Sequence, residues 1–308
     1  MSDIITRRAH LKRFGRTAAL FSAGLLLLAL CLDWTVGVYI DRQDGRRLIG
    51  REVYQLKKSL ARADPSVKSI YLGDSVARQL FPPGTERSDE TRHLTSNQAI
   101  SLAGHYYLLE EAIRAYPNLQ DVAFLYTTRS WRNNLNQVYT SDYFCGYFTQ
   151  PRHVWETFAV TRDVPLLGTH VVRAAFPNLA ALNSWMSLSR AGTGADRDES
   201  DAHDANSAQF DHSLVVSPVS AHFAQRMKAL CAEKGITLRF HACPVSDEFH
   251  AQDDSKVYDS PIPTVAATHF GPDKRHLKPE AVAFVRKLME AHLQMAARTG
   301  ARARVAAP

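Results

Sequence analysis

The stretch "YLGDSVARQL", residues 71–80, predicts a point at which a strand ends and a helix begins. Tyr71 and Leu72 continue an apolar run, Gly73 breaks it, and Asp74 and Ser75 then fall on the turn. The simplest interpretation is a strand-ending turn with polar capping residues. The alternative is a serine nucleophile presented at the edge of a sheet, which requires a base elsewhere in the chain.

Short apolar strands alternate with amphipathic helices along the rest of the chain. The expected strands cover residues 66–75, 121–128 and 235–246. The expected helices cover 44–64, 101–116, 151–190 with breaks at Pro165 and Pro177, a segment from Ser217, and a last one from Pro279 to about Ala297. Strands separated by helices predict an α/β domain with a parallel sheet.

The charge of the chain is concentrated at its two ends. The formal charge is +6, with five basic residues in residues 1–16 and three in residues 298–308. The middle of the chain is therefore close to neutral. No basic surface for nucleic acid is expected.

Residues 17–40 form an apolar segment that is interrupted only by Asp33. A bilayer requires about 20 such residues, and Trp34 and Tyr39 suit the far interface. Because basic residues precede the segment, the N-terminus is predicted in the cytoplasm and the rest outside. The predicted parts are a cytoplasmic basic segment 1–16, a transmembrane anchor 17–40, an exported α/β domain 45–297 with a mobile loop at about 190–212, and a basic tail 298–308.

Three other interpretations of the N-terminal segment stay open. A cleaved secretory signal needs a small-residue site after the apolar run, and no convincing one follows. Cys31 could end a lipoprotein signal, but Leu30 before it is bulky. Residues 6–12, "TRRAHLK", resemble a twin-arginine export signal, with His10 where an aromatic residue is usual.

Three cysteines, Cys145, Cys231 and Cys243, would face the exported side, where disulfides form. An odd number leaves at least one without a partner there, and the pairing stays open. The chain has no C-x-x-C pair, so a structural zinc site is not expected. We expect neither a metal nor an organic cofactor.

The candidate base for Ser75 lies in "HFGPDKRHLKPEA", residues 269–281, just before the last helix. Asp273 and His276 are three positions apart in this loop. That spacing lets the carboxylate accept the Nδ1 proton of the histidine and leaves Nε2 free to face Ser75. Functional groups of parallel sheets gather at the carboxyl ends of strands, where Ser75 is expected.

These two motifs resemble the first and last motif blocks of the SGNH, or GDSL-type, hydrolase superfamily. The match consists of "GDS" after the first strand and Asp-x-x-His-Leu before the last helix. It covers most of residues 67–297 and implies a flavodoxin-like three-layer sandwich with a central parallel sheet. It also implies that Ser75 is the nucleophile, His276 the base and Asp273 the acid that orients it.

The middle motif blocks match less closely. Residues 96–113, "SNQAISLAGHYYLLEEAI", resemble the second block, which implies that the backbone N–H groups of Ser75 and Gly104 stabilise an oxyanion. The Gly-x-Asn-Asp of the third block is absent after the second strand. Asn133 is the first choice to supply that amide, with Asn134 and Asn136 as alternatives.

Four further residues are predicted to contact substrate. They are Asp74, Arg129, Trp131 and His269. Structural roles for Arg129 and Trp131 are equally open, and histidines such as His105 are expected to be surface or packing residues.

The membrane anchor and the missing third block resemble the branch of this superfamily that acetylates exported polysaccharides, such as the alginate-acetylation proteins. This resemblance implies acyl, chiefly acetyl, transfer to an exported polysaccharide or oligosaccharide, in the periplasm at a bacterial inner membrane. A multi-spanning acyl-transport protein is the partner that such a role implies. Two alternatives remain: a carbohydrate acetylesterase, and a non-catalytic scaffold or glycan-binding component of a secretion complex.

Overall fold

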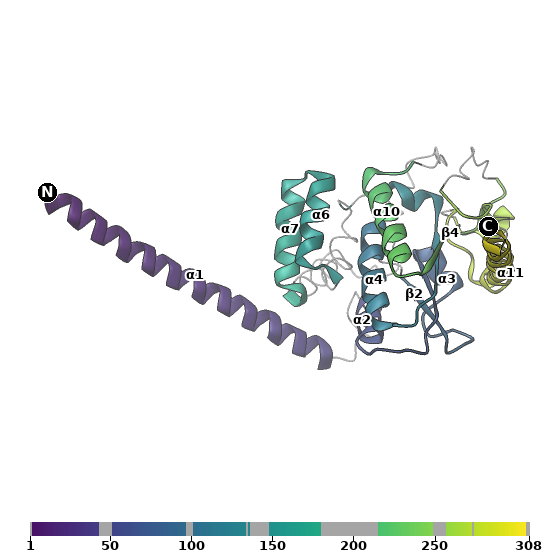
Figure 1. Ribbon diagram of the computed structural model, residues 1–308, viewed down its shortest axis with the longest axis horizontal. Helices are drawn as coiled ribbons and strands as arrows, with labels where there is room; N and C mark the ends of the chain where they lie inside the picture. The colour runs from purple at the N-terminus through teal and green to yellow at the C-terminus, as the bar shows by residue number, and fades with distance from the viewer. Residues whose placement is uncertain are drawn as a thin grey trace.

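The computed structural model describes residues 2–42, 51–96, 101–133, 135, 148–179, 215–248, 257–272 and 274–305. A long helix, α1 (Ser2–Arg42), extends from an α/β domain (Figure 1). The α/β class with a central parallel sheet and one N-terminal apolar helix is confirmed. The loop predicted at residues 190–212 lies outside the described residues.

The central sheet has four parallel strands in the order β2-β1-β3-β4. Its strands are β1 (Ser69–Gly73), β2 (Thr91–Thr95), β3 (Asp121–Tyr126) and β4 (Thr237–Ala242). The last residue of β1, Gly73, pairs with Thr95 on one side and with Leu125 on the other. The carboxyl ends of β1, β2 and β3 therefore meet at one edge, where loops can bring side chains together.

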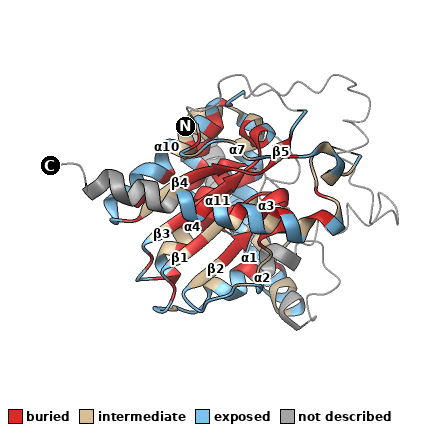
Figure 2. Cartoon of the chain, turned by 90° about the vertical axis from the view of Figure 1, so that its right-hand side faces the viewer, coloured by how far each residue is buried: buried red, intermediate tan, exposed pale blue. Residues whose placement is uncertain are grey.

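Helices pack against the sheet from both faces. One buried cluster joins the strands to α4 (Leu102–Ala115) and α10 (Pro218–Glu233). A second cluster joins them to α3 (Ser75–Leu80) and α11 (Pro279–Val305). Figure 2 shows the largely buried strands behind α3 and α11. Because both faces are covered, the strands are apolar along most of their length.

The helix boundaries follow from capping residues in the sequence. Ser101 caps α4 and Ser217 caps α10, each by accepting a backbone N–H of the first turn. Asp163 caps α7 in the same way, and Pro165 stands in its first turn. The remaining elements are α2 (Arg51–Leu60), η1 (Thr128–Arg132), α6 (Pro151–Thr161), α7 (Val164–Ala175), β5 (Val245–Ser246), β6 (Thr264–Val265) and η3 (Ala267–His269).

Strand β2 is not among the strands expected from the sequence, and the last helix is longer than expected. In "TRHLT", residues 91–95, Leu94 is the one aliphatic residue, so the segment lacks the apolar run of a central strand. It forms a strand because it pairs with β1 at the edge of the sheet. Helix α11 continues to Val305 rather than ending near Ala297.

The N-terminal helix is long and apolar enough to cross a membrane between Arg13 and Tyr39. The side chain of Asp33, within this segment, contacts the chain that follows α7. Its Oδ2 accepts from Asn178 Nδ2 at 3.0 Å, and its Oδ1 accepts from the backbone N–H of Leu179 at 2.8 Å. The acidic residue in the apolar helix is therefore hydrogen-bonded to the domain, which offsets the cost of its position.

Gly73 ends β1 at a place where no side chain fits. A Cβ atom on this residue would lie 2.3 Å from the carbonyl oxygen of Leu125 and 2.4 Å from the Cβ of Ala77. The first contact is with the backbone of β3, which cannot move without disturbing the sheet. The glycine therefore allows β1, β3 and α3 to approach one another closely.

We expect Gly73→Ala to lower the free energy of unfolding by roughly 3 kcal/mol, because the new methyl group must displace β3 or α3. Urea unfolding of the full chain in detergent measures this. Gly168→Ala in α7 is the matched control, since no heavy atom lies within 4 Å of its Cβ position. The control is expected to be neutral or to stabilise by about 0.5–1 kcal/mol. Equal stabilities for the two variants would contradict the packing argument.

Candidate active site

Ser75 is the first residue of α3 and follows directly on the turn that ends β1. Its backbone position is set by Gly73, which turns the chain, and by Asp74, which caps the helix. Only 9% of Ser75 is exposed. The hydroxyl therefore lies at the carboxyl edge of the sheet, beside the end of β3, in a largely water-excluded position.

Asp74 is fully buried and holds two loops together. Its Oδ1 accepts from the N–H groups of Val76 at 3.1 Å and Ala77 at 3.4 Å, at the start of α3. Its Oδ2 accepts from the N–H of Thr127 at 2.9 Å, from Thr127 Oγ1 at 2.8 Å and from Ser130 Oγ at 2.8 Å. The predicted substrate contact of Asp74 is therefore corrected: it has no exposed surface and donors on both oxygens, and it positions the turn that carries Ser75.

The structure places His276 next to Ser75, although 201 positions separate them in the chain. The Nε2 atom of His276 lies 2.9 Å from Ser75 Oγ. This is the distance at which a histidine can remove the proton of a serine hydroxyl. The first and last motifs of the sequence therefore meet at one site.

The loop that carries His276 is held against α3. Phe270 and Leu277 form an antiparallel bridge across it and are both buried in the cluster that includes α3. The N–H of Gly271 donates to the carbonyl of His276 at 2.8 Å, and the N–H of Leu277 donates to Gln79 Oε1 of α3 at 3.0 Å. Apolar packing and backbone hydrogen bonds thus position the imidazole. Asp273, the predicted acid, lies outside the described residues, so its role stays a prediction.

Arg275 is a residue at this site that the sequence analysis missed. Its Nη2 donates to Ser75 Oγ at 3.5 Å, and the side chain is half-buried. Its positive charge lowers the pKa values of Tyr126 and Cys243, although burial and the charge of Asp74 keep both pKa values well above normal. The signal that could have found it is its position directly before His276.

The two backbone N–H groups predicted to stabilise an oxyanion, those of Ser75 and Gly104, differ in their hydrogen bonds. Among the described residues, the backbone N–H of Ser75 meets no acceptor, and its contact with an oxyanion stays a prediction. The N–H of Gly104 donates to Ser101 Oγ at 3.2 Å as part of the cap of α4. This N–H is therefore engaged in the cap, and a contact between Gly104 and an oxyanion stays a prediction.

Asn133 ends η1 and lies beside the site. Its carbonyl accepts from Ser217 Oγ at 3.1 Å and Ser220 Oγ at 3.3 Å, which ties η1 to the start of α10. Its side chain hydrogen-bonds to the buried phenol of Tyr126. The charge of Asp74 raises the pKa of this phenol, and the charge of Arg275 lowers it. A contact between Asn133 and an oxyanion stays a prediction. The alternatives Asn134 and Asn136 lie outside the described residues.

The other predicted substrate contacts divide between core and surface. Trp131 is 2% exposed and donates from Nε1 to the Tyr258 hydroxyl at 2.9 Å, so it packs in the core and does not line an open site. The ring of His269 lies 5.3 Å from that of Phe284 on α11. Arg129 is exposed on η1, and its contact with substrate stays a prediction.

The buried cysteines supply no second nucleophile. Cys231 and Cys243 are both free and buried, so they do not pair with each other, and Cys145 lies outside the described residues. Burial raises the pKa of Cys231 to about 12 and that of Cys243 well above normal. Both thiols therefore stay protonated at neutral pH.

Comparison with known proteins adds no relative. No protein-family model matches the chain, and neither a curated protein nor a solved structure does. The site is therefore interpreted from its own geometry.

We expect Asp74→Asn to destabilise the protein by about 3 kcal/mol or more, because an amide group would face buried N–H and O–H donors in place of a charged acceptor. Urea unfolding measures the loss. Asp89→Asn, at an exposed position, is the control and is expected to stay within about 0.5 kcal/mol of the wild type. A midpoint for Asp74→Asn equal to that of the control would show that the carboxylate does not hold the two loops.

Proposed function

We propose that the protein is a serine-dependent acyltransferase of the SGNH type, which moves an acyl group, chiefly acetyl, onto an exported carbohydrate. The observation that carries the proposal is the 2.9 Å distance between Ser75 Oγ and His276 Nε2. The strand order β2-β1-β3-β4 also supports it, because flavodoxin-like sheets have this order and bind ligands where it reverses, between β1 and β3.

In the proposed reaction, Ser75 Oγ attacks the carbonyl carbon of an acyl ester while His276 Nε2 takes the hydroxyl proton. The tetrahedral intermediate then expels the donor alcohol, which receives that proton from His276, and an acyl-serine remains. A sugar hydroxyl then attacks the acyl-serine and gives its proton to His276. The bond between the acyl carbon and Ser75 Oγ breaks, Ser75 Oγ takes that proton back from His276, and the new sugar ester leaves. Asp273 is proposed to orient the imidazole by accepting from Nδ1.

The negative charge on the tetrahedral oxygen requires hydrogen-bond donors. Of the two backbone N–H groups expected to supply them, that of Gly104 already donates to Ser101. We propose the N–H of Ser75 as one donor and Arg275 as the second, since the guanidinium already reaches the nucleophile. A positive charge in a largely buried site stabilises a developing oxyanion strongly. In this proposal Arg275 replaces the backbone N–H of Gly104.

The location of the reaction is proposed from the N-terminal helix. Basic residues precede the apolar span, which favours a cytoplasmic N-terminus and a domain outside it, at a bacterial inner membrane. A transferase benefits from this location because acyl groups delivered across that membrane reach it directly. A multi-spanning acyl-transport protein is the partner proposed for that delivery.

A non-catalytic role is the second candidate. It is favoured by one observation, that the N–H of Gly104 is engaged in a helix cap and leaves the expected oxyanion hole incomplete. In that case the domain would bind exported glycan or support a secretion complex without reacting with it. Reactivity of Ser75 separates the two candidates.

We expect a fluorophosphonate probe to label the wild-type protein and not Ser75→Ala, because only an activated serine attacks phosphorus at a useful rate. His276→Ala should label about 10³-fold more slowly or not at all. Ser88→Ala, at an exposed serine, is the control and should label normally. Labelling that does not depend on Ser75 would remove the catalytic proposal and leave the binding role.

The same assay tests Arg275. Arg275→Met should label on the order of 10²-fold more slowly than wild type, because the phosphonyl oxygen occupies the place of the oxyanion. Lys274→Met, which removes the neighbouring exposed cation paired with Glu248, is the matched control.

An assay with an acetyl donor, with and without an oligosaccharide acceptor, separates the transferase from the esterase. Acetate release at the same rate in both cases would indicate the esterase.

We expect alkaline phosphatase fused after residue 60, at the end of α2, to be active in cells, because this reporter folds only outside the cytoplasm. A β-galactosidase fusion at the same position should be inactive. The opposite pair of results would place the domain in the cytoplasm and overturn the exported substrate.

A further inference from the structure

Helix α7 presents an uncharged face to its surroundings. Val164, Val171 and Val172 are 65%, 48% and 57% exposed. The other exposed positions of the helix are Pro165, Gly168, Thr169 and Ala175. A surface helix of a soluble domain shows the reverse pattern, with charged residues outward. The face therefore needs an apolar neighbour.

The ionisable residues of α7 turn away from this face. Arg173 is half-buried, and His170 is 1% exposed. Burial lowers the pKa of His170 to about 4, so its ring is neutral at pH 7. The outward surface of α7 thus carries no charge at physiological pH.

The α6–α7 pair is fixed to the rest of the domain. Tyr107 of α4 and Thr157 of α6 share a hydrogen bond of 2.8 Å between their hydroxyl groups. Glu156 of α6 accepts from Arg226 Nε of α10 at 2.6 Å. The orientation of α7 is therefore set by the same helices that cover the sheet.

The end of α7 meets the far end of the apolar span. Asn178, three residues after α7, and Leu179 both donate to Asp33 of α1. A Cβ at Gly37, one turn further along α1, would lie 2.8 Å from Asn178 Nδ2. Counted from Thr17, where the apolar segment begins, a rise of about 30 Å, the thickness of the hydrocarbon core, ends at Gly37. This contact is thus at the level where a spanning helix leaves the bilayer.

The side of the domain that faces α1 also carries residues typical of a membrane surface. Figure 1 shows α6 and α7 on the side toward α1, and α11 on the opposite side. On α6, Trp155 is 64% exposed. Arg152, which pairs with Glu110 at 2.9 Å, and Arg162, which caps the end of α6, are also exposed. Tryptophan suits the interfacial region, and arginine is attracted to anionic headgroups.

We propose that α7 is an interfacial helix whose exposed valines, Val164, Val171 and Val172, insert into the headgroup–acyl boundary of the bilayer that α1 spans. The helix lies on the membrane and does not cross it. The proposal goes beyond the serine chemistry and does not depend on it; it requires that α1 crosses the bilayer. The domain is then held at two points, by α1 and by α7, so the direction in which the Ser75 site faces is fixed relative to the membrane.

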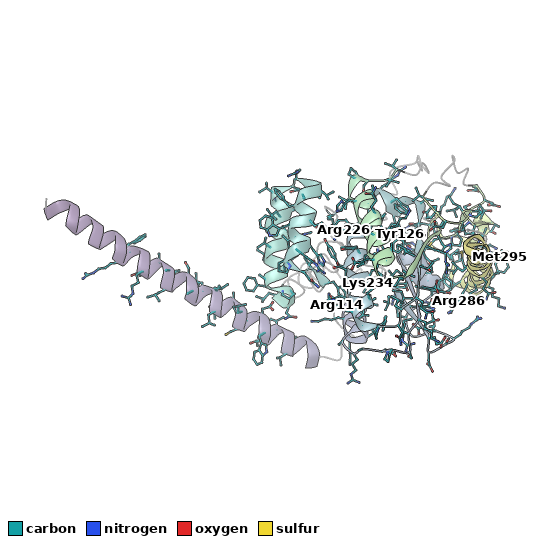
Figure 3. The ribbon with its side chains drawn as sticks, in the orientation of Figure 1. Arg114, Tyr126, Arg226, Lys234, Arg286 and Met295 are labelled. Atoms are coloured by element: carbon teal, nitrogen blue, oxygen red, sulfur yellow. The ribbon has the colours of Figure 1, made fainter. Side chains whose placement is uncertain are left out.

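A fluorescence-quenching experiment on the full chain tests this. Val172→Cys is labelled with an environment-sensitive nitrobenzoxadiazole dye in a Cys31→Ala, Cys145→Ala background; Cys231 and Cys243 are buried. The protein is placed in nanodiscs of phosphatidylethanolamine and phosphatidylglycerol. Met295→Cys is the control, since Met295 is 61% exposed on α11, away from α1 (Figure 3).

The dye at position 172 should be quenched several-fold more by a nitroxide on the lipid chain, and several-fold less by aqueous iodide, than the dye at position 295. Equal iodide quenching at the two positions would overturn the proposal. Protection from iodide without quenching by the lipid nitroxide would also overturn it, because a protein surface, a second copy or another partner, would then cover α7.

A charge variant gives a second test with the same quenching measurement. Val171→Glu places a carboxylate on the same face at an exposed position, where folding does not require the valine. It should lower the lipid-nitroxide quenching at position 172 several-fold, while Val215→Glu, at an exposed valine outside α7, should leave it unchanged. Circular dichroism confirms that both variants are folded. Unchanged quenching in Val171→Glu would contradict insertion of this face.

Discussion

The rest of the site depends on the carboxylate of Asp74. It joins two loops at the carboxyl edge of the sheet. It is fully buried, and its oxygens accept from the start of α3 and from Thr127 and Ser130 after β3. A buried charge is tolerated only when donors surround it, so the two loops cannot separate without exposing an unpaired anion. Gly73 allows this arrangement, because β3 and α3 lie where its side chain would be.

The position of the histidine has a different origin. Phe270 and Leu277 anchor its loop in the apolar cluster that α3 and α11 share, so packing sets the distance between Ser75 and His276. A hydrogen bond between two side chains alone would be too weak to bring remote segments together. Because the same loop carries Arg275, the packing that places His276 beside Ser75 also brings a positive charge to the Ser75 hydroxyl.

The N-terminal helix is hydrogen-bonded to the domain that carries the site, through the chain that follows α7. Asp33 accepts two hydrogen bonds from the chain after α7, which places the exposed valines of α7 near the end of the span. In the proposed arrangement, α6 and α7 separate the membrane from the sheet. A transferase that receives its acyl group from the bilayer side would use such a fixed orientation.

What the sequence by itself determined follows from local rules: the alternation of strands and helices, the helix starts near Ser101 and Ser217, the apolar N-terminal helix, and the glycine turn before Ser75. Each depends on neighbours within one helical turn or on simple periodicity. The tertiary structure alone decided that "TRHLT" pairs as an edge strand, that Trp131 lies in the core, and that Arg275 reaches the serine. These outcomes join residues far apart in the chain. They depend on how the two faces of the sheet pack, which no local pattern encodes.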